Sequence, residues 1–84
     1  MSQELVKIGD VSHYYTNIEV AVVELNEHLK IGDKIMIKGA TTEFTQLVNS
    51  IQIDHDQVNE AESGDSIGLQ VKDRVRLGDQ VFKL

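Results

Sequence analysis

The run Asp54-His55-Asp56 holds the residues of this 84-residue sequence whose types best suit chemistry. Carboxylates and imidazoles hold metal ions and move protons. Adjacent residues on a strand point to opposite faces, so the three side chains cannot converge on one ion while the chain is extended. We therefore interpret the run as a polar turn that closes a strand. We keep His55 as a candidate binding residue, and we predict no metal and no cofactor.

Aromatic side chains form a second candidate site. Tyr14 and Tyr15 follow His13, and together they could stack on a nucleic acid base or on a peptide. Alternatively, one tyrosine packs on the core while the other covers an end of the fold.

A third candidate lies near the end of the chain. Lys72, Arg74 and Arg76 alternate with other residues, so on a strand they share one face and could bind phosphate or a carboxylate. The alternative is a solvated stripe opposite Val75 and Leu77, which would anchor the following turn. No nucleophile–base set has motif support, so we predict that the protein is not an enzyme.

The charge balance bears on possible partners. Eight basic and 14 acidic residues give a net charge of -6. Acidic residues cluster in the middle of the chain and basic residues near its end. Phosphate backbones favour clustered cations, so we predict no general DNA binding, although a local contact to an RNA end or a protein partner is compatible with this charge.

Composition limits the class of protein further. The sequence has no cysteine, which excludes disulfides and fits a reducing cytosol. The longest apolar run, residues 20–23, is too short to span a bilayer, and residues 1–4 lack signal-peptide character. We expect one domain over residues 1–84, in a cytoplasmic monomer without membrane contact.

Three Gly-Asp pairs position these candidates. An alternating apolar run follows each pair: Gly32-Asp33, Gly64-Asp65 and Gly78-Asp79. We interpret each pair as a turn, because glycine tolerates positive φ and aspartate bonds its own backbone in turns. Strands are predicted over residues 5–11, 18–25, 34–38, 45–53, 66–71 and 80–84. Gly9 is expected to host a bulge. The inward face of the second strand is expected to switch near Val22.

Residues 44–53 are ambiguous. Phe44, Leu47, Val48 and Ile51 have helical spacing, but several β-branched residues favour a strand, which we predict over residues 45–53. The predicted fold is an all-β, six-stranded antiparallel closed barrel with Ile35, Ile37, Ile51, Ile67, Leu69 and Val71 inside.

Several motifs occur in the order known from a family. Residues 29–39, 61–69 and 78–81 resemble segments of domain 2 of translational GTPases such as elongation factor Tu. Residues 9–15 and 52–56 resemble stand-alone, elongation factor-like versions of that domain. The chain also resembles the C-terminal domain of collagenase-like peptidases. The likeness runs from about residue 8 to residue 84 and implies a Greek-key barrel, without the phosphate-binding loop of a GTPase.

In that family the barrel holds the aminoacyl end of tRNA. The resemblance places Gln52 and Gln70 at two positions of the adenosine pocket, where the family has a glutamate and an apolar residue. Glutamine could still bond a base edge.

Two functions follow as hypotheses. The first is a non-enzymatic binding module that contacts an RNA end or a protein partner in translation or RNA modification. The alternative is an accessory domain that positions substrate and works in trans with a collagenase-like peptidase.

Overall fold

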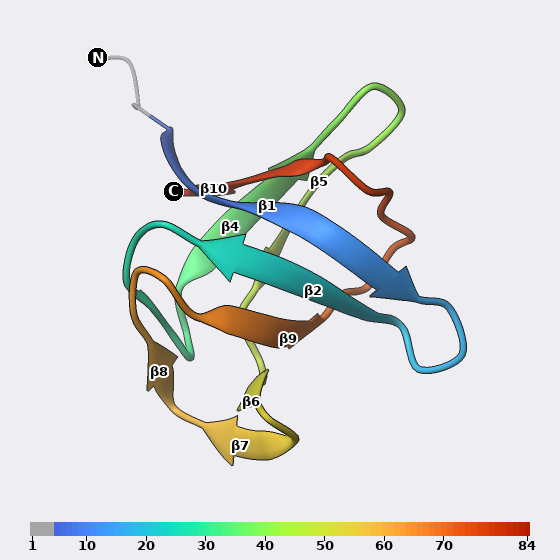
Figure 1. Ribbon diagram of the computed structural model, residues 1–84. Coiled ribbons are helices and arrows are strands. Elements are labelled where there is room, and N and C mark those ends of the chain that lie inside the picture. Colours follow the sequence, from blue (N-terminus) through green and yellow to red (C-terminus); the bar gives the residue numbers. More distant parts are fainter. Residues whose placement is uncertain (1–4) are drawn as a thin grey trace.

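The computed structural model describes residues 5–84, which form strands joined by turns (Figure 1). The strands are β1 (Val6–Tyr15), β2 (Val20–Leu25), β3 (Leu29–Lys30), β4 (Lys34–Lys38), β5 (Glu43–Leu47), β6 (Ile51–Ile53), β7 (Asp56–Val58), β8 (Glu60–Ala61), β9 (Ser66–Gln70) and β10 (Gln80–Lys83). No helix occurs within residues 5–84. The predictions of an all-β fold and of a strand rather than a helix after Phe44 are therefore confirmed.

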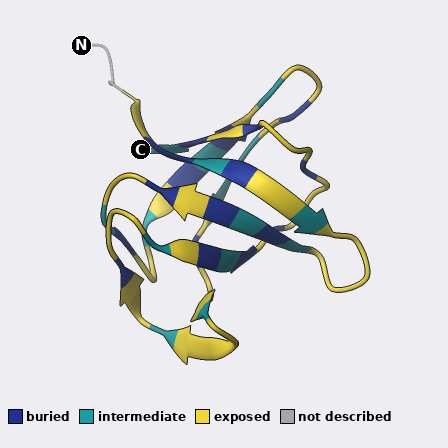
Figure 2. Ribbon diagram, viewed as in Figure 1, coloured by how far each residue is buried: buried dark blue, intermediate teal, exposed yellow. Residues whose placement is uncertain are grey.

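Eight strands form one antiparallel sheet in the order β5-β4-β10-β1-β2-β9-β6-β7. Strands β3 and β8 form a separate two-stranded ribbon. The large sheet curls, so that β1, β2 and β9 lie in front of β4 and β5 (Figure 1). Buried residues alternate with more exposed ones along β2, β4 and β9, which places one face of these strands on the core and the other toward solvent (Figure 2).

The prediction of a closed, six-stranded barrel is wrong. The sheet is open, with β5 and β7 at its two edges, and residues 5–84 form ten strands. Three of the additional strands, β3, β7 and β8, have at most three residues, which is too short for an alternation pattern to reveal. The fourth arises because the strand predicted over residues 45–53 is interrupted between β5 and β6.

The interruption explains why the sheet does not close. Val48 leaves the ladder, donates its N–H to the Asp33 carbonyl and accepts the Gly32 N–H. The side chain of Gln46 takes over part of the missing pairing: its amide donates to the Gln70 carbonyl at 2.9 Å and accepts the Lys72 N–H at 2.9 Å. Side-chain hydrogen bonds thus satisfy backbone groups that a closing strand would otherwise pair.

The Gly-Asp pairs build three turns of the same construction. Each glycine has a positive φ, between 89° and 96°, and each aspartate carboxylate accepts the backbone N–H three residues earlier. Each turn also exchanges two backbone hydrogen bonds with a buried residue, namely Val48, Leu25 or Val11. The repeated turn chemistry predicted from the sequence is therefore present three times.

The predicted core is confirmed. The six residues expected inside are all at most 3% exposed: Ile35, Ile37, Ile51, Ile67, Leu69 and Val71. Val75 is buried as expected, but Leu77 is 68% exposed and does not anchor the turn.

The expected switch of face on β2 is wrong. Ala21, Val23 and Leu25 face the core along the whole strand, while Val20 and Val22 lie on the outer face. The irregularities occur instead on β1, between Lys7 and Gly9 and between Val11 and His13. The bulge predicted near Gly9 is therefore close to an observed one. The second irregularity prolongs β1 to Tyr15, with Tyr14 half-buried and Tyr15 exposed.

The described part of the chain contains no helix long and apolar enough to cross a membrane. The prediction about residues 1–4 lies outside the described residues.

Candidate functional site

A row of residues crosses the outer face of the sheet. The strand registers pair His13 with Val22, Val22 with Gly68, Gly68 with Gln52, and Gln52 with Gln57. Directly opposite residues of neighbouring strands share a face and stand about 5 Å apart. Gly68 therefore leaves the row without a side chain at its centre.

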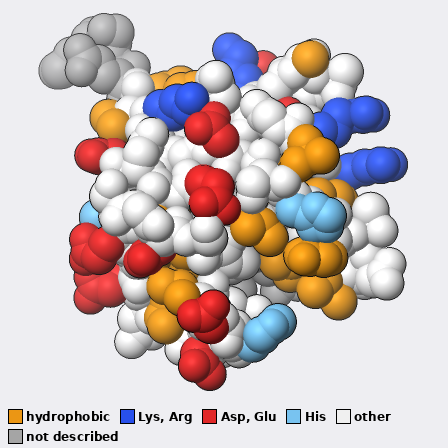
Figure 3. All heavy atoms as spheres, viewed as in Figure 1, with side chains coloured by type: hydrophobic (Ala, Val, Ile, Leu, Met, Phe, Trp, Pro, Cys, Tyr) orange, Lys and Arg blue, Asp and Glu red, His pale blue; other side chains and the backbone are white. Residues whose placement is uncertain are grey.

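The space above Gly68 is a shallow hollow of about 210 Å³, which we call the outer groove. Its apolar lining consists of Ile18, Val20, Val22 and Tyr15, and it is bordered by Ile67, whose side chain faces the core. Its polar lining consists of Gln52, Asp54, His55 and Ser66. Figure 3 shows hydrophobic side chains gathered on this face, toward the turn between β1 and β2. A mainly apolar hollow with a few polar groups is the usual form of a binding site.

The hairpin between β6 and β7 places two polar residues at the groove. Asp54 and His55 have φ angles of 52° and 69°, and Ile53 pairs with Asp56 across this two-residue turn. Two consecutive positive φ angles match the twist of the flanking strands and are tolerated best by Gly, Asn and Asp. The predicted polar turn is present, and Asp56 already belongs to β7.

Tyr15 forms the wall at the end of β1. Its ring packs edge-on against His13, with the ring centroids 4.4 Å apart. The two residues share the outer face because they are two positions apart on one strand. Tyr15 and Ile18 also line an adjoining hollow together with Tyr14, so these two residues lie at the border of two hollows.

Ser66 and His55 line the same groove but are not paired for catalysis. The Ser66 hydroxyl donates to the Glu24 carboxylate at 2.5 Å, and that carboxylate also accepts from the Ser12 hydroxyl at 3.2 Å. A nucleophilic serine needs its base within hydrogen-bond reach. The local geometry thus fixes Ser66 as a polar wall and suits binding better than acyl transfer.

The remaining predicted site residues lie elsewhere. Gln70 and Lys72 line a second hollow of about 390 Å³ with Gln46, and the Lys72 ammonium lies 5.9 Å from the centre of the Phe44 ring. Arg74 and Arg76 were expected on one strand face, but β9 ends at Gln70 and β10 begins at Gln80, so both lie in a connecting segment. The structure brings together Tyr15, Gln52 and His55, and it does not bring the other candidates into the outer groove.

The apolar walls of the groove were assigned to the core from the sequence. Ile18, Val20 and Val22 share one parity, and the prediction treated this parity as inward before a switch of face. In the structure, the residues of the other parity, Ala21, Val23 and Leu25, face the core. Ala21 was the available signal in the sequence: it extends the apolar parity of Val23 and Leu25 by one position, and alanine is often fully buried.

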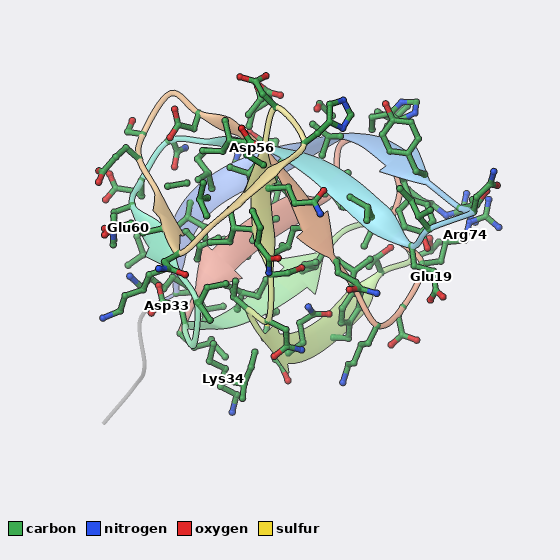
Figure 4. All side chains as sticks on the ribbon, turned by 90° about the horizontal axis from the view of Figure 1, so that it is seen from below. Glu19, Asp33, Lys34, Asp56, Glu60 and Arg74 are labelled. Atoms are coloured by element: carbon green, nitrogen blue, oxygen red, sulfur yellow. The ribbon has the colours of Figure 1, made fainter. Side chains whose placement is uncertain are left out.

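A separate cluster could hold a cation. Strands β3 and β8 pair Leu29 with Ala61, which brings His28 to Glu60 and Glu62 although they are far apart in the sequence. The His28 Nε2 lies 2.7 Å from a Glu60 oxygen and 4.0 Å from a Glu62 oxygen. One imidazole and two carboxylates are ligands that Zn²⁺ accepts. Figure 4 shows Glu60 at one end of the molecule and Arg74 at the other.

Known proteins resemble this chain in sequence. No family model matches it. An uncharacterized protease of Methanocaldococcus jannaschii is 41% identical over 80 residues, which cover 94% of this chain and 20% of that protein. A collagenase of Porphyromonas gingivalis is 31% identical over 84 residues, covering 98% of this chain and 20% of the collagenase. The chain spans about a fifth of the length of these curated relatives.

Solved structures share the fold. The C-terminal domain of a U32 peptidase of Geobacillus thermoleovorans has a TM-score of 0.86 and 21% identity, over 92% of this chain and 90% of that domain. Its selenomethionine form gives a TM-score of 0.87 and 21% identity, over 96% of this chain and all of that one. These matches support the collagenase-like part of the predicted resemblance. They do not support the part that relates the chain to domain 2 of elongation factor Tu.

Proposed function

We propose that this chain is a non-catalytic accessory domain that works with a collagenase-like peptidase and holds protein substrate for it. The observation that carries the proposal is the extent of the matches. Nearly the whole chain corresponds to about a fifth of two peptidase relatives, and its fold corresponds to a C-terminal peptidase domain. The elongation factor-like function has no comparable support.

The geometry of the outer groove agrees with a binding role. The groove is mainly apolar, and its serine is bonded to Glu24 rather than to His55. A domain that only positions a substrate lowers KM, because it adds binding energy that is equal in the ground state and the transition state. It leaves kcat nearly unchanged.

A chimera tests the proposal. In the Porphyromonas collagenase, the segment that matches this chain would be replaced by residues 1–84, and cleavage of collagen would be compared with that of a collagenase lacking the segment. We expect the truncated enzyme to have a KM raised by about tenfold with kcat within about twofold, and the chimera to restore KM.

The opposite results contradict the proposal. If deletion of the segment lowers kcat and leaves KM unchanged, or if the chimera behaves like the truncated enzyme, the chain does not position substrate. Proteolysis by the isolated chain would show that the domain is itself catalytic.

A further inference from the structure

We propose that the outer groove binds a protein segment that carries one bulky apolar side chain directly beside a lysine or arginine. This inference rests on the proposed function and names the part of the substrate that the domain holds.

The size of the groove fits one side chain. Its volume of about 210 Å³ lies below the range of about 300–1,000 Å³ that is usual for small-molecule and cofactor sites. A Cβ built on Gly68 would lie 3.4 Å from the nearest Val20 methyl and 3.7 Å from the Gln52 Cβ, which are ordinary contact distances. The floor therefore has room for an inserted side chain between these two neighbours.

The charge around the groove favours a cationic neighbour. Asp54 lines the groove, and the Glu24 carboxylate on the same face holds Ser66. None of the described lining residues is lysine or arginine. Complementary charge at the rim of an interface selects partners and accelerates association. The same carboxylates repel phosphate, so a protein segment fits this surface better than RNA does.

The polar lining suits a peptide backbone. The Gln52 amide can both donate and accept a hydrogen bond, and it lies beside Gly68 across the β6–β9 pair. An extended segment above Gly68 could bond this amide while its apolar side chain contacts Ile18, Val20 and Val22. The proposed ligand thus contacts the apolar lining with its bulky side chain, the carboxylates with its lysine or arginine, and the Gln52 amide with its backbone.

Binding of three labelled peptides to the full chain tests the proposal. The probe is a ten-residue peptide with one leucine between two lysines in a glycine–serine background. In one matched peptide alanine replaces the leucine, and in the other glutamates replace the lysines. By fluorescence anisotropy we expect the leucine–lysine peptide to bind about tenfold or more tightly than either matched peptide.

Three protein variants locate the binding site. Gly68→Leu should abolish binding because its side chain fills the floor. The variant Asp54→Asn should weaken binding about three- to tenfold and reduce its dependence on salt. Asparagine tolerates the positive φ of residue 54, so this variant keeps the turn. The matched control Glu27→Gln, Glu43→Gln removes two exposed carboxylates outside the groove and should leave binding unchanged. Thermal midpoints would establish that each variant is folded.

Equal binding of all three peptides, no binding of any, or unchanged binding by folded Gly68→Leu would overturn the inference. So would a single-stranded RNA that binds more tightly than the leucine–lysine peptide and is lost in Gly68→Leu. The collagenase chimera separates this inference from the proposed function. A restored KM without peptide binding would refute the groove specificity alone, whereas peptide binding without a restored KM would refute the accessory function alone.

Discussion

Single glycines decide how closely two parts of this molecule approach. Gly39 lies against the carboxylate of Asp79, a residue that is 4% exposed and accepts the Arg76 N–H at 2.9 Å. A Cβ at position 39 would overlap this carboxylate. A Cβ at Gly68, by contrast, would meet its nearest neighbour at 3.4 Å, which is an ordinary contact distance. The same residue type thus has a packing role at one position and leaves a hollow at the other.

Gly39→Ala should therefore destabilise the protein by about 1–3 kcal/mol, because Asp79 must move and its turn must distort. Gly68→Ala is the matched control and should change stability by less than about 1 kcal/mol, since its Cβ meets only ordinary contacts. Urea denaturation of both variants measures the difference. Equal free energies of unfolding would show that Asp79 can move away from residue 39 at no cost.

At the scale of elements, the gap between β5 and β6 is the feature that separates this fold from a closed barrel. The chain crosses the gap through Val48, which is 1% exposed and bonded to the turn at Gly32-Asp33. Gln46 spans the remaining distance with its side-chain amide. One glutamine therefore connects the edge strand β5 to the backbone that follows β9.

Gln46→Ala should lower the free energy of unfolding by about 1–3 kcal/mol, because two hydrogen bonds of about 0.5–1.5 kcal/mol each are lost. Amide hydrogen exchange gives the specific readout. The Lys72 N–H loses its acceptor and should exchange faster, while the N–H groups within the β2–β9 ladder should lose protection only in proportion to global stability. Unchanged exchange at Lys72 would mean that the Gln46 bridge is not formed in solution.

At the scale of the whole molecule, carboxylates outnumber the basic side chains. On the face that Figure 3 shows, carboxylates extend from the centre to the lower left, and the lysines and arginines lie mainly at the top and right. Arg74 lies at one end of the molecule, where Glu19 is also found (Figure 4). With a net charge of -6, the protein as a whole repels a polyanion.

Duplex DNA should accordingly fail to bind at physiological salt, since few cations are available to release its counterions. Titration of labelled duplex DNA and single-stranded RNA at two salt concentrations measures this. Any RNA contact should depend weakly on salt and should be reduced in the double variant Arg74→Ala, Arg76→Ala, whose thermal midpoint should stay unchanged because both residues are exposed. Tight duplex binding with a steep dependence on salt would contradict the charge argument.

The sequence by itself determined the class of fold, the three turns and the core. Glycine at a positive φ and aspartate bonded to its own turn are local effects, and strict alternation such as that of residues 66–71 identifies a buried face without reference to any partner strand. Asp54-His55 was recognisable as a turn because it is a polar run that directly follows a predicted strand, which is also a local feature of the sequence. Tyr15 and His55 were identified as candidate residues from their chemical types, whereas Gln52 was proposed from the resemblance to the adenosine pocket of elongation factor domain 2.

Only the tertiary structure decided which of these candidates meet. The outer groove depends on the registers that align Val22, Gly68 and Gln52 across three strands. Register is a property of paired strands, and a shift by one residue would turn every side chain to the other face. Closure of the sheet is likewise non-local, because it depends on where Val48 and Gln46 find their hydrogen-bond partners. His28 meets Glu60 and Glu62 for the same reason, through a pairing of two short strands that lie far apart in the sequence.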